Sequence, residues 1–284
     1  MLSQALLCQF YQEACELELQ AFKPGNVSVH ADGHGMCVED FKISARVSAR
    51  SLCNPDHSLG EKIYYAVKAT REVVGCNTNL GIILLCAPLI QAALDCYRLA
   101  NFEQALATVL DHTTVADAEW VFKAIKLASP GGLGESVEQD VNSIPTLTLQ
   151  EVMRLASFKD RIALQYITNF KDVFDFGVLR YNEKFDQWGR KDWAAVSVYT
   201  GLLSQHPDSH IERKYGDRYS ELVTSRMLSL DAALSDSSKP ELLIALFAEV
   251  DREFKLKGIN PGTAADLTVA TLLAVLLKDF FGAS

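Results

Sequence analysis

The chain has 284 residues, 49% of them hydrophobic and 22% charged, and its 27 Lys and Arg against 36 Asp and Glu give a formal net charge of −9. These proportions are typical of a globular protein and exclude a disordered chain. General binding to nucleic acid or to an anionic membrane needs a basic face, so the acidic balance argues against both partners. A small local anion site remains compatible with this acidic balance.

The seven cysteines include no C-x-x-C pair, which argues against a zinc ribbon or a redox motif and favours a reducing, cytoplasmic location. The first charged residue is Glu13, so the start of the chain lacks the basic segment of a secretory signal. Two apolar runs, 80–94 and 264–277, are shorter than the roughly 20 residues that span a membrane. We expect both to be buried helices.

Apolar residues recur at three- and four-residue spacing from Leu2 to Leu17, which predicts an amphipathic helix that ends before Lys23. The same reasoning predicts further helices over 38–52, 58–75, 80–98, 102–111, 114–128, 148–156, 158–174, 193–204, 216–233, 239–256 and 264–281. No alternating run is long enough to require a sheet, and 173–181 comes nearest. The expected fold is all-α: one compact domain over 1–284, of about twelve helices, with a buried apolar C-terminal helix.

Several predicted helices begin with a capping box, in which a Ser or Thr is followed three residues later by an acid. The pairs are Ser58/Glu61, Thr114/Asp117, Thr148/Glu151 and Thr263/Asp266. Such a box explains Asp117 and Asp266 without any catalytic role. Asp160, which follows Ser157, has a similar explanation as a helix cap.

Two Pro-Gly turns carry matching polar residues: Lys23-Pro24-Gly25-Asn26-Val27-Ser28 and Asn260-Pro261-Gly262-Thr263. A Pro-Gly turn can point successive backbone N–H groups into one concavity. The second turn leads into the last apolar helix, whose N-terminus would favour an anion. The alternative is that both turns only separate helices, and neither matches a phosphate-loop or dinucleotide motif.

Two further clusters contain side chains suited to metal or phosphate. His30-Ala31-Asp32-Gly33-His34 alternates ligand types in a manner compatible with a divalent metal, or is an ordinary surface loop. The segment 206–216 gathers Asp208, Arg213 and Lys214; the two cations suit phosphate oxygens, and the carboxylate suits Mg²⁺. The alternative for 206–216 is a helix start capped by Asp208 or Ser209.

In this order, the segments resemble the triphosphoribosyl-dephospho-CoA synthases, the CitG-like proteins. The matching pieces are Lys23-Pro24-Gly25, Asp40-Phe41 with Ser44-Ala45, Asn77-Thr78-x-x-Gly81, Thr113-Thr114-x-x-Asp117-Ala118, the Gly-rich 130–134 loop, Asp208 before Arg213-x-x-Gly216, and Asn260-Pro261-Gly262-Thr263-Ala264-Ala265-Asp266-Leu267. They cover nearly the whole chain. Asn77-Thr78-Asn79-Leu80-Gly81 replaces the Asn-Thr-His-Lys-Gly of citrate-lyase-associated members, so the chain resembles a divergent archaeal or one-carbon-metabolism branch.

The resemblance implies an ATP- and Mg²⁺-dependent transferase that joins ribose C1 of ATP to the 2′-hydroxyl of 3′-dephospho-CoA and releases adenine. It implies catalytic roles for Asp117, Asp160 and Asp208, metal ligation by Asp32, Asp208 and Asp266, and nucleotide binding by Lys23, Gly25, Asn26, Ser28, Asn77, Thr78, Arg213, Lys214, Gly262 and Thr263. Small-molecule nucleotides and a second copy in a homodimer are the expected partners. One alternative is a related transferase of tetrahydromethanopterin or methanofuran biosynthesis with another acceptor, and a second is a non-catalytic helical nucleotide-binding protein.

Overall fold

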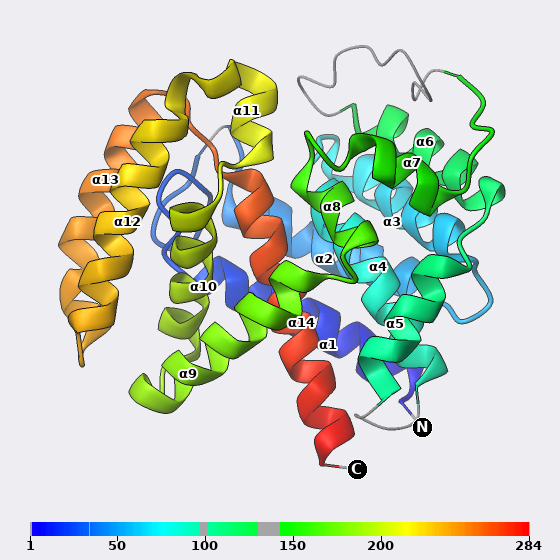
Figure 1. The fold of residues 1–284 in the computed structure, drawn as a ribbon, viewed down its shortest axis with the longest axis horizontal. Helices are drawn as coiled ribbons and strands as arrows, with labels where there is room; N and C mark the ends of the chain where they lie inside the picture. The colour runs from blue at the N-terminus through cyan, green and yellow to red at the C-terminus, as the bar shows by residue number, and fades with distance from the viewer. Residues whose placement is uncertain (1, 34, 97–100, 130–142, 284) are drawn as a thin grey trace. The chain divides into compact units, whose positions relative to one another are not determined.

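The computed structural model describes residues 2–33, 35–96, 101–129 and 143–283, and every named element within these ranges is a helix (Figure 1). Across the same residues the β pairing consists of two isolated bridges, Ser28–Ala31 and Gly33–Met36. The all-α prediction is therefore confirmed. The strand-like segment 173–181 lies in a π-helix, η2 (Asp172–Val178), that continues into α9 (Leu179–Trp188).

The chain divides into two compact units. Unit 1 comprises residues 1–15, 40–170 and 273–284, and unit 2 comprises residues 16–39 and 171–272. Three of the four boundaries fall inside helices, in α1 (Gln4–Gln20), near the start of α2 (Val38–Leu52) and in α14 (Gly262–Gly282). The single domain over 1–284 stays a prediction.

Unit 1 contains the start of α1, the end of α14 and a set of short helices between them. These are α2 (Val38–Leu52), α3 (Leu59–Val74), α4 (Leu80–Asp95), α5 (Phe102–Asp111), α6 (Val115–Ala128), α7 (Leu149–Ala156) and α8 (Arg161–Ile167). Helix α3 packs against α6, and α4 packs against α5. Most of α4 is buried, so the apolar run at 80–94 forms a core helix as predicted.

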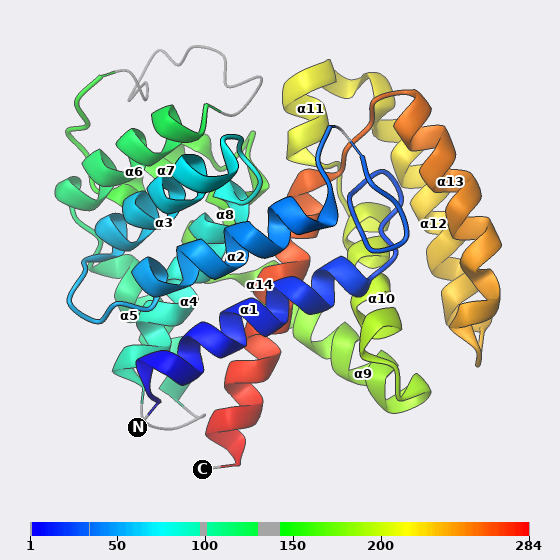
Figure 2. The same ribbon diagram turned by 180° about the vertical axis from the view of Figure 1, so that it is seen from behind.

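Unit 2 is organised around α10 (Lys191–Gln205), whose residues from Trp193 to Ser204 are all buried. Around it lie η2, α9, α11 (Ser209–Tyr215), η3 (Gly216–Tyr219), α12 (Ser220–Asp236), η4 (Pro240–Leu243), α13 (Ile244–Leu256) and the first half of α14. Helix α10 packs against α9 and α12, and α12 lies beside α13 in both views (Figures 1 and 2).

The predicted helices 38–52 and 102–111 have the observed bounds, whereas the single helix predicted over 158–174 is wrong. Helix α8 ends at Ile167 because Asn169 and Phe170 take positive φ values of 52° and 60°. Helix α9 was not predicted. The sequence indicated α11 only as the alternative for 206–216, because a helix of seven residues is too short to show a clear apolar period.

Three predicted capping boxes are confirmed, at Ser58/Glu61, Thr114/Asp117 and Thr148/Glu151. The fourth is wrong, because α14 begins at Gly262 and places Thr263 within its first turn. Among the described residues, no helix combines the length and the apolarity needed to cross a membrane. The Gly-rich 130–134 loop and His34 lie outside the described residues.

Candidate functional site

The two predicted Pro-Gly turns meet in unit 2, although they lie at opposite ends of the sequence. The Asn26 side-chain amide donates to Oδ1 of Asn260 at 2.8 Å, across 234 residues. Gly25 has φ +83°, and a Cβ added there would lie 2.9 Å from the carbonyl oxygen of Ile259. Only glycine therefore fits this conformation and this close approach. We call residues 23–28 and 259–263 the paired turns.

Two buried side chains from other helices fix the backbone of the first turn. The Gly25 N–H donates to Oδ1 of Asp251 on α13 at 2.9 Å, and the Tyr199 hydroxyl on α10 donates to the carbonyl oxygen of Pro24 at 2.8 Å. Burial raises the pKa of Tyr199 well above its ordinary value, and the nearby carboxylates add to this, so the phenol keeps its proton. Asp251 also pairs with Lys255 at 3.0 Å. The turn is thus held rigidly from two helices.

Lys23 is 0% exposed and its ammonium points into the protein. It donates to the carbonyl oxygens of Glu18 at 2.9 Å and Val27 at 2.8 Å, and pairs with Oε1 of Glu18 at 3.1 Å. Burial lowers the pKa of Lys23 and raises that of Glu18. These three short contacts match the three donors of an ammonium, and the carbonyl oxygen of Ala21 lies further away, at 3.5 Å. Lys23 closes the loop between α1 and the first turn, and binding a phosphate would require these bonds to break.

Asp208 caps two helices with one carboxylate. Its Oδ1 accepts from the backbone N–H groups of His210 at 2.9 Å and Ile211 at 3.2 Å, and its Oδ2 accepts from that of Ala264 at 2.9 Å. The residue is 4% exposed, and burial raises its pKa to about 6 although the backbone bonds act in the opposite direction. The predicted anion site at the start of α14 is therefore occupied, at Ala264, by the protein's own carboxylate.

Helix α11 is anchored at both of its ends to the segment that contains the second turn. At its start, the His210 N–H donates to Oγ1 of Thr263 at 3.2 Å, and at its end the Tyr215 hydroxyl donates to the carbonyl oxygen of Gly258 at 3.0 Å. A Cβ added to Gly262 would lie 2.5 Å from Nδ1 of His210, so glycine permits this contact.

The anchored helix carries the predicted cations. Arg213 and Lys214 form its last turn; Arg213 is half-buried and Lys214 is exposed. Helix α11, which carries the basic pair, is thus held by hydrogen bonds to the segment that contains the second turn.

The predicted metal ligands of unit 2 do not form a preformed metal centre. Asp32 is exposed in the loop after the first turn, Asp266 is half-buried on α14, and both oxygens of Asp208 accept backbone bonds. Within the residues that the structure describes, no group of three or more His, Cys, Asp and Glu side chains is placed to hold a metal ion. Ligation by these acids stays a prediction.

Two predicted catalytic acids lie in unit 1, where both cap helices. Oδ1 of Asp117 accepts from the Gly60 N–H of α3 at 2.8 Å, while Oδ2 accepts from the N–H and the hydroxyl of Thr114 at 2.9 and 2.7 Å. Asp160 is the N-cap of α8 and accepts from the N–H groups of Ile162 and Ala163. The structural explanation of both acids is confirmed, and their catalytic roles stay predictions.

The remaining predicted residues are placed in polar turns. Oδ1 of Asn77 accepts from the Leu80 N–H at 3.1 Å, which supports the start of α4. The Thr78 hydroxyl lies 2.5 Å from that of Ser44, and both are buried. In unit 2, Ser28 is buried and its Oγ accepts from the His30 N–H at 3.3 Å.

The sequence reasoning missed three residues that shape the first turn: Glu18, Tyr199 and Asp251. Two of them carried a signal. Glu18 follows Ala14 by four residues on the apolar stripe of α1, and Asp251 lies among the buried positions Phe247, Val250 and Phe254 of α13. A charged residue on an apolar face requires a buried partner. Tyr199 is indistinguishable in sequence from an ordinary core aromatic residue.

A family model described as CitG, ATP:dephospho-CoA triphosphoribosyl transferase, matches residues 4–284. The chain is also similar to a crystal structure from Archaeoglobus fulgidus, described provisionally as a triphosphoribosyl-dephospho-CoA synthase. The TM-score is 0.65 and the identity 22%, over 83% of this chain and 97% of that one. No curated protein sequence matches the chain. Because the family model extends from the first helix to the last, the chain belongs to the CitG family of ATP:dephospho-CoA triphosphoribosyl transferases.

Proposed function

We propose that this chain transfers the triphosphoribosyl group of ATP to the 2′-hydroxyl of 3′-dephospho-CoA, and that the triphosphate binds at the paired turns of unit 2. The observation that carries the proposal is the meeting of the two Pro-Gly turns, Pro24-Gly25 and Pro261-Gly262, beside a helix that ends in two cations. The family match supports the reaction, and this geometry supports the place of the polyphosphate.

The reaction breaks the bond between ribose C1 and adenine and forms a bond from that carbon to the acceptor oxygen. The proton lost by the hydroxyl is balanced by the proton that the departing adenine gains. Arg213 and Lys214 would hold phosphate oxygens, the first as a planar fork and the second as a point charge. The buried carboxylate of Asp208 supports α11 and α14, which makes it a positioning residue in this proposal.

Mg²⁺ fits this site as a companion of the triphosphate. It usually keeps several waters and is held by one or two carboxylates together with substrate phosphates. Asp32 and Asp266, which retain solvent exposure, are the residues that would hold it, and Asp208 does not fit because backbone N–H groups occupy its oxygens. The bound ion would neutralise charge on the triphosphate. The cytoplasmic location and the homodimer stay predictions.

The test is adenine release from ATP, MgCl₂ and dephospho-CoA by the full chain, measured by chromatography. Loss of a charge-assisted hydrogen bond costs about 1.5–3 kcal/mol, so Arg213→Ala should raise the KM for ATP by about tenfold or more. Lys214→Ala should raise it less, and Arg252→Ala, an exposed cation on α13, should leave it unchanged. Melting temperatures establish that each variant is folded.

The two alternatives give different results in the same assay. A transferase of one-carbon cofactor biosynthesis would release adenine or phosphate only with a pterin or furan acceptor. A non-catalytic binder would show a thermal shift with ATP and Mg²⁺ but no product. Failure of every acceptor to yield product would overturn the proposed function.

A further inference from the structure

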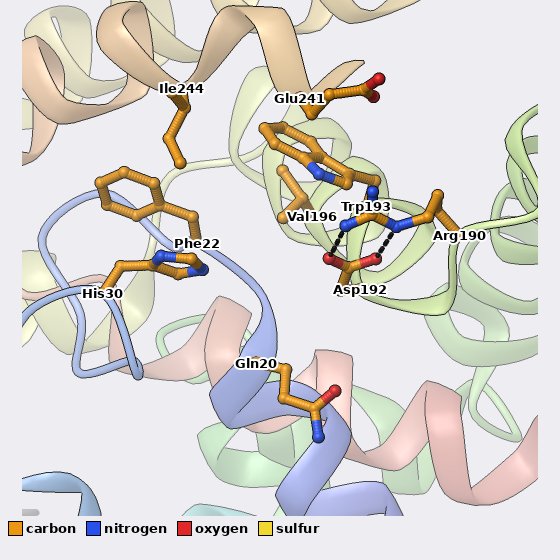
Figure 3. Close-up of a pocket in the computed structure, with 9 residues that line it drawn as sticks. All are labelled: Gln20, Phe22, His30, Arg190, Asp192, Trp193, Val196, Glu241 and Ile244. Atoms are coloured by element: carbon orange, nitrogen blue, oxygen red, sulfur yellow. Dashed lines mark hydrogen bonds and ion pairs between the residues drawn. The ribbon is translucent and has the colours of Figure 1, made fainter. Parts of the chain in front are cut away.

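Unit 2 contains a cavity of about 120 Å³ beside the first of the paired turns (Figure 3). Its lining comes from the end of α1, the loop after it, the start of α10 and the junction of η4 with α13. Phe22, Trp193, Val196 and Ile244 supply apolar surface. Phe22 immediately precedes Lys23, so the cavity and the first turn share one loop.

Three of the nine residues that line this cavity carry aromatic rings: Phe22, His30 and Trp193. The rings of Phe22 and His30 are stacked, with centroids 5.1 Å apart and an angle of 23° between their planes. Trp193 is buried and packs edge-on against Phe247, with centroids 5.6 Å apart at 89°, which fixes its indole. A rigid aromatic wall favours a planar aromatic ligand, because stacking a base on such a ring contributes about 1–3 kcal/mol.

The polar groups at the rim disfavour phosphate. The Arg190 guanidinium donates to both oxygens of Asp192, at 3.0 and 2.7 Å, so its charge is already paired. Glu241 adds a carboxylate, and Gln20 adds an amide that can both donate and accept. Apart from His30, the lining carries one cation, Arg190, and two acids, Asp192 and Glu241, so acids outnumber cations by one. A neutral ligand with N–H donors is therefore preferred over an anion.

The size of the cavity limits the ligand further. The cavity volume is about 120 Å³. It is well below the 300–1,000 Å³ that is typical of sites for drug-sized molecules. One fused ring system fits this space, whereas a whole nucleotide does not.

We propose that this cavity binds a purine base, the adenine ring of one of the two substrates, with the ring against His30 and Trp193 and its exocyclic amino group toward Glu241. This inference rests on the proposed function, because it takes the base from ATP or from dephospho-CoA. It adds a base subsite on the loop that leads into the proposed phosphate site.

Equilibrium dialysis of the full chain against radiolabelled free adenine tests the subsite. Ile244, which is 44% exposed, lines the cavity, and Leu246, which is 39% exposed, lies on the same helix outside the lining. Ile244→Trp should fill the space and weaken adenine binding at least tenfold, and His30→Ala should weaken it about five- to a hundredfold by removing a stacking face. Leu246→Trp, the matched control, should bind as the unchanged chain does. Melting temperatures confirm that each variant is folded.

Equal adenine binding by Ile244→Trp and the unchanged chain would overturn the inference, as would no binding of free adenine. Competition identifies the source: displacement by ATP alone assigns the base of the donor, and displacement by dephospho-CoA alone assigns that of the acceptor. Displacement by neither overturns the subsite. If the unchanged chain turns over its substrates but binds no free adenine, only this inference is rejected. If the unchanged chain binds adenine and Ile244→Trp does not, but the unchanged chain shows no turnover, only the proposed function is rejected.

Discussion

The backbone N–H of Gly25 donates to Oδ1 of Asp251 at 2.9 Å, across 226 residues of sequence. Gly25 has φ +83°, a conformation that the turn could leave easily if its N–H were not held. Asp251 is itself fixed, because it is 7% exposed and pairs with Lys255 at 3.0 Å. This contact preorganises the first of the paired turns.

Replacing Asp251 tests the value of this preorganisation. Asp251→Ala leaves the Gly25 N–H without its acceptor, which should cost about 1–3 kcal/mol of unfolding free energy and raise the KM for ATP. Asp251→Asn keeps an acceptor oxygen and should lose less. Glu249→Ala, an exposed acid on the same helix, is the control. Urea unfolding and initial rates measure both effects, and an unchanged KM in Asp251→Ala would contradict the positioning role.

The buried pair Glu18–Lys23 should behave as one unit. Lys23→Met leaves the Glu18 carboxylate buried without its cation, and breaking such a pair costs about 3–5 kcal/mol. Adding Glu18→Gln removes that unpaired charge and should recover a large part of the loss. A double-mutant cycle by urea unfolding measures the coupling.

The same double variant reports on function. If Lys23 acts only inside the protein, the double variant keeps its KM for ATP once it is folded. Additive costs of the two single changes would show that the pair is not coupled.

Asp208 should give the protein a specific pH dependence. Burial raises its folded-state pKa to about 6 from the ordinary value of 3.8. The folded state therefore favours the protonated carboxyl. The resulting contribution to the free energy of unfolding is fully present below the unfolded-state pKa and is lost as the pH rises through about 6. Asp208→Asn cannot titrate, so its stability relative to the unchanged chain should improve by about 3 kcal/mol between roughly pH 4 and pH 7.

Urea unfolding of both proteins across this pH range measures the difference. At low pH the Asn variant should be the less stable protein, because its amide has a single acceptor oxygen for the N–H groups that now bind both carboxylate oxygens. If the free energy of unfolding depended on pH in the same way in both proteins, the raised pKa of Asp208 would be contradicted. A loss of the limb near pH 6 in the rate profile of Asp208→Asn would show that this group also takes part in catalysis.

Gly262 should be required for the contact between α14 and α11. In Gly262→Ala the new methyl group would lie 2.5 Å from Nδ1 of His210, and such overpacking costs about 1–3 kcal/mol. His210→Ala removes the imidazole, so the double variant should melt within a few degrees of His210→Ala alone. Calorimetry measures the melting temperatures. If Gly262→Ala lowered the melting temperature equally with and without the His210 imidazole, the destabilisation would come from the backbone and not from this contact.

Local features of the fold were readable from the sequence because their interactions span only a few residues. The bounds of α2 and α5 and three capping boxes follow from apolar spacing and from side chains that bond within three positions. The π-helix at Asp172–Val178 was not readable in this way, because it follows two residues of positive φ that no local pattern marks.

For the site, the sequence by itself determined the chemical types: two Pro-Gly turns with polar flanks, a basic pair and several acids. The tertiary structure decided what those groups face. It brought Asn26 to Asn260, turned Lys23 inward to Glu18, and gave Asp208 three backbone donors on two helices. The physical reason is that burial and long-range partners set the charge and the availability of a side chain, and neither is encoded within a few neighbouring residues.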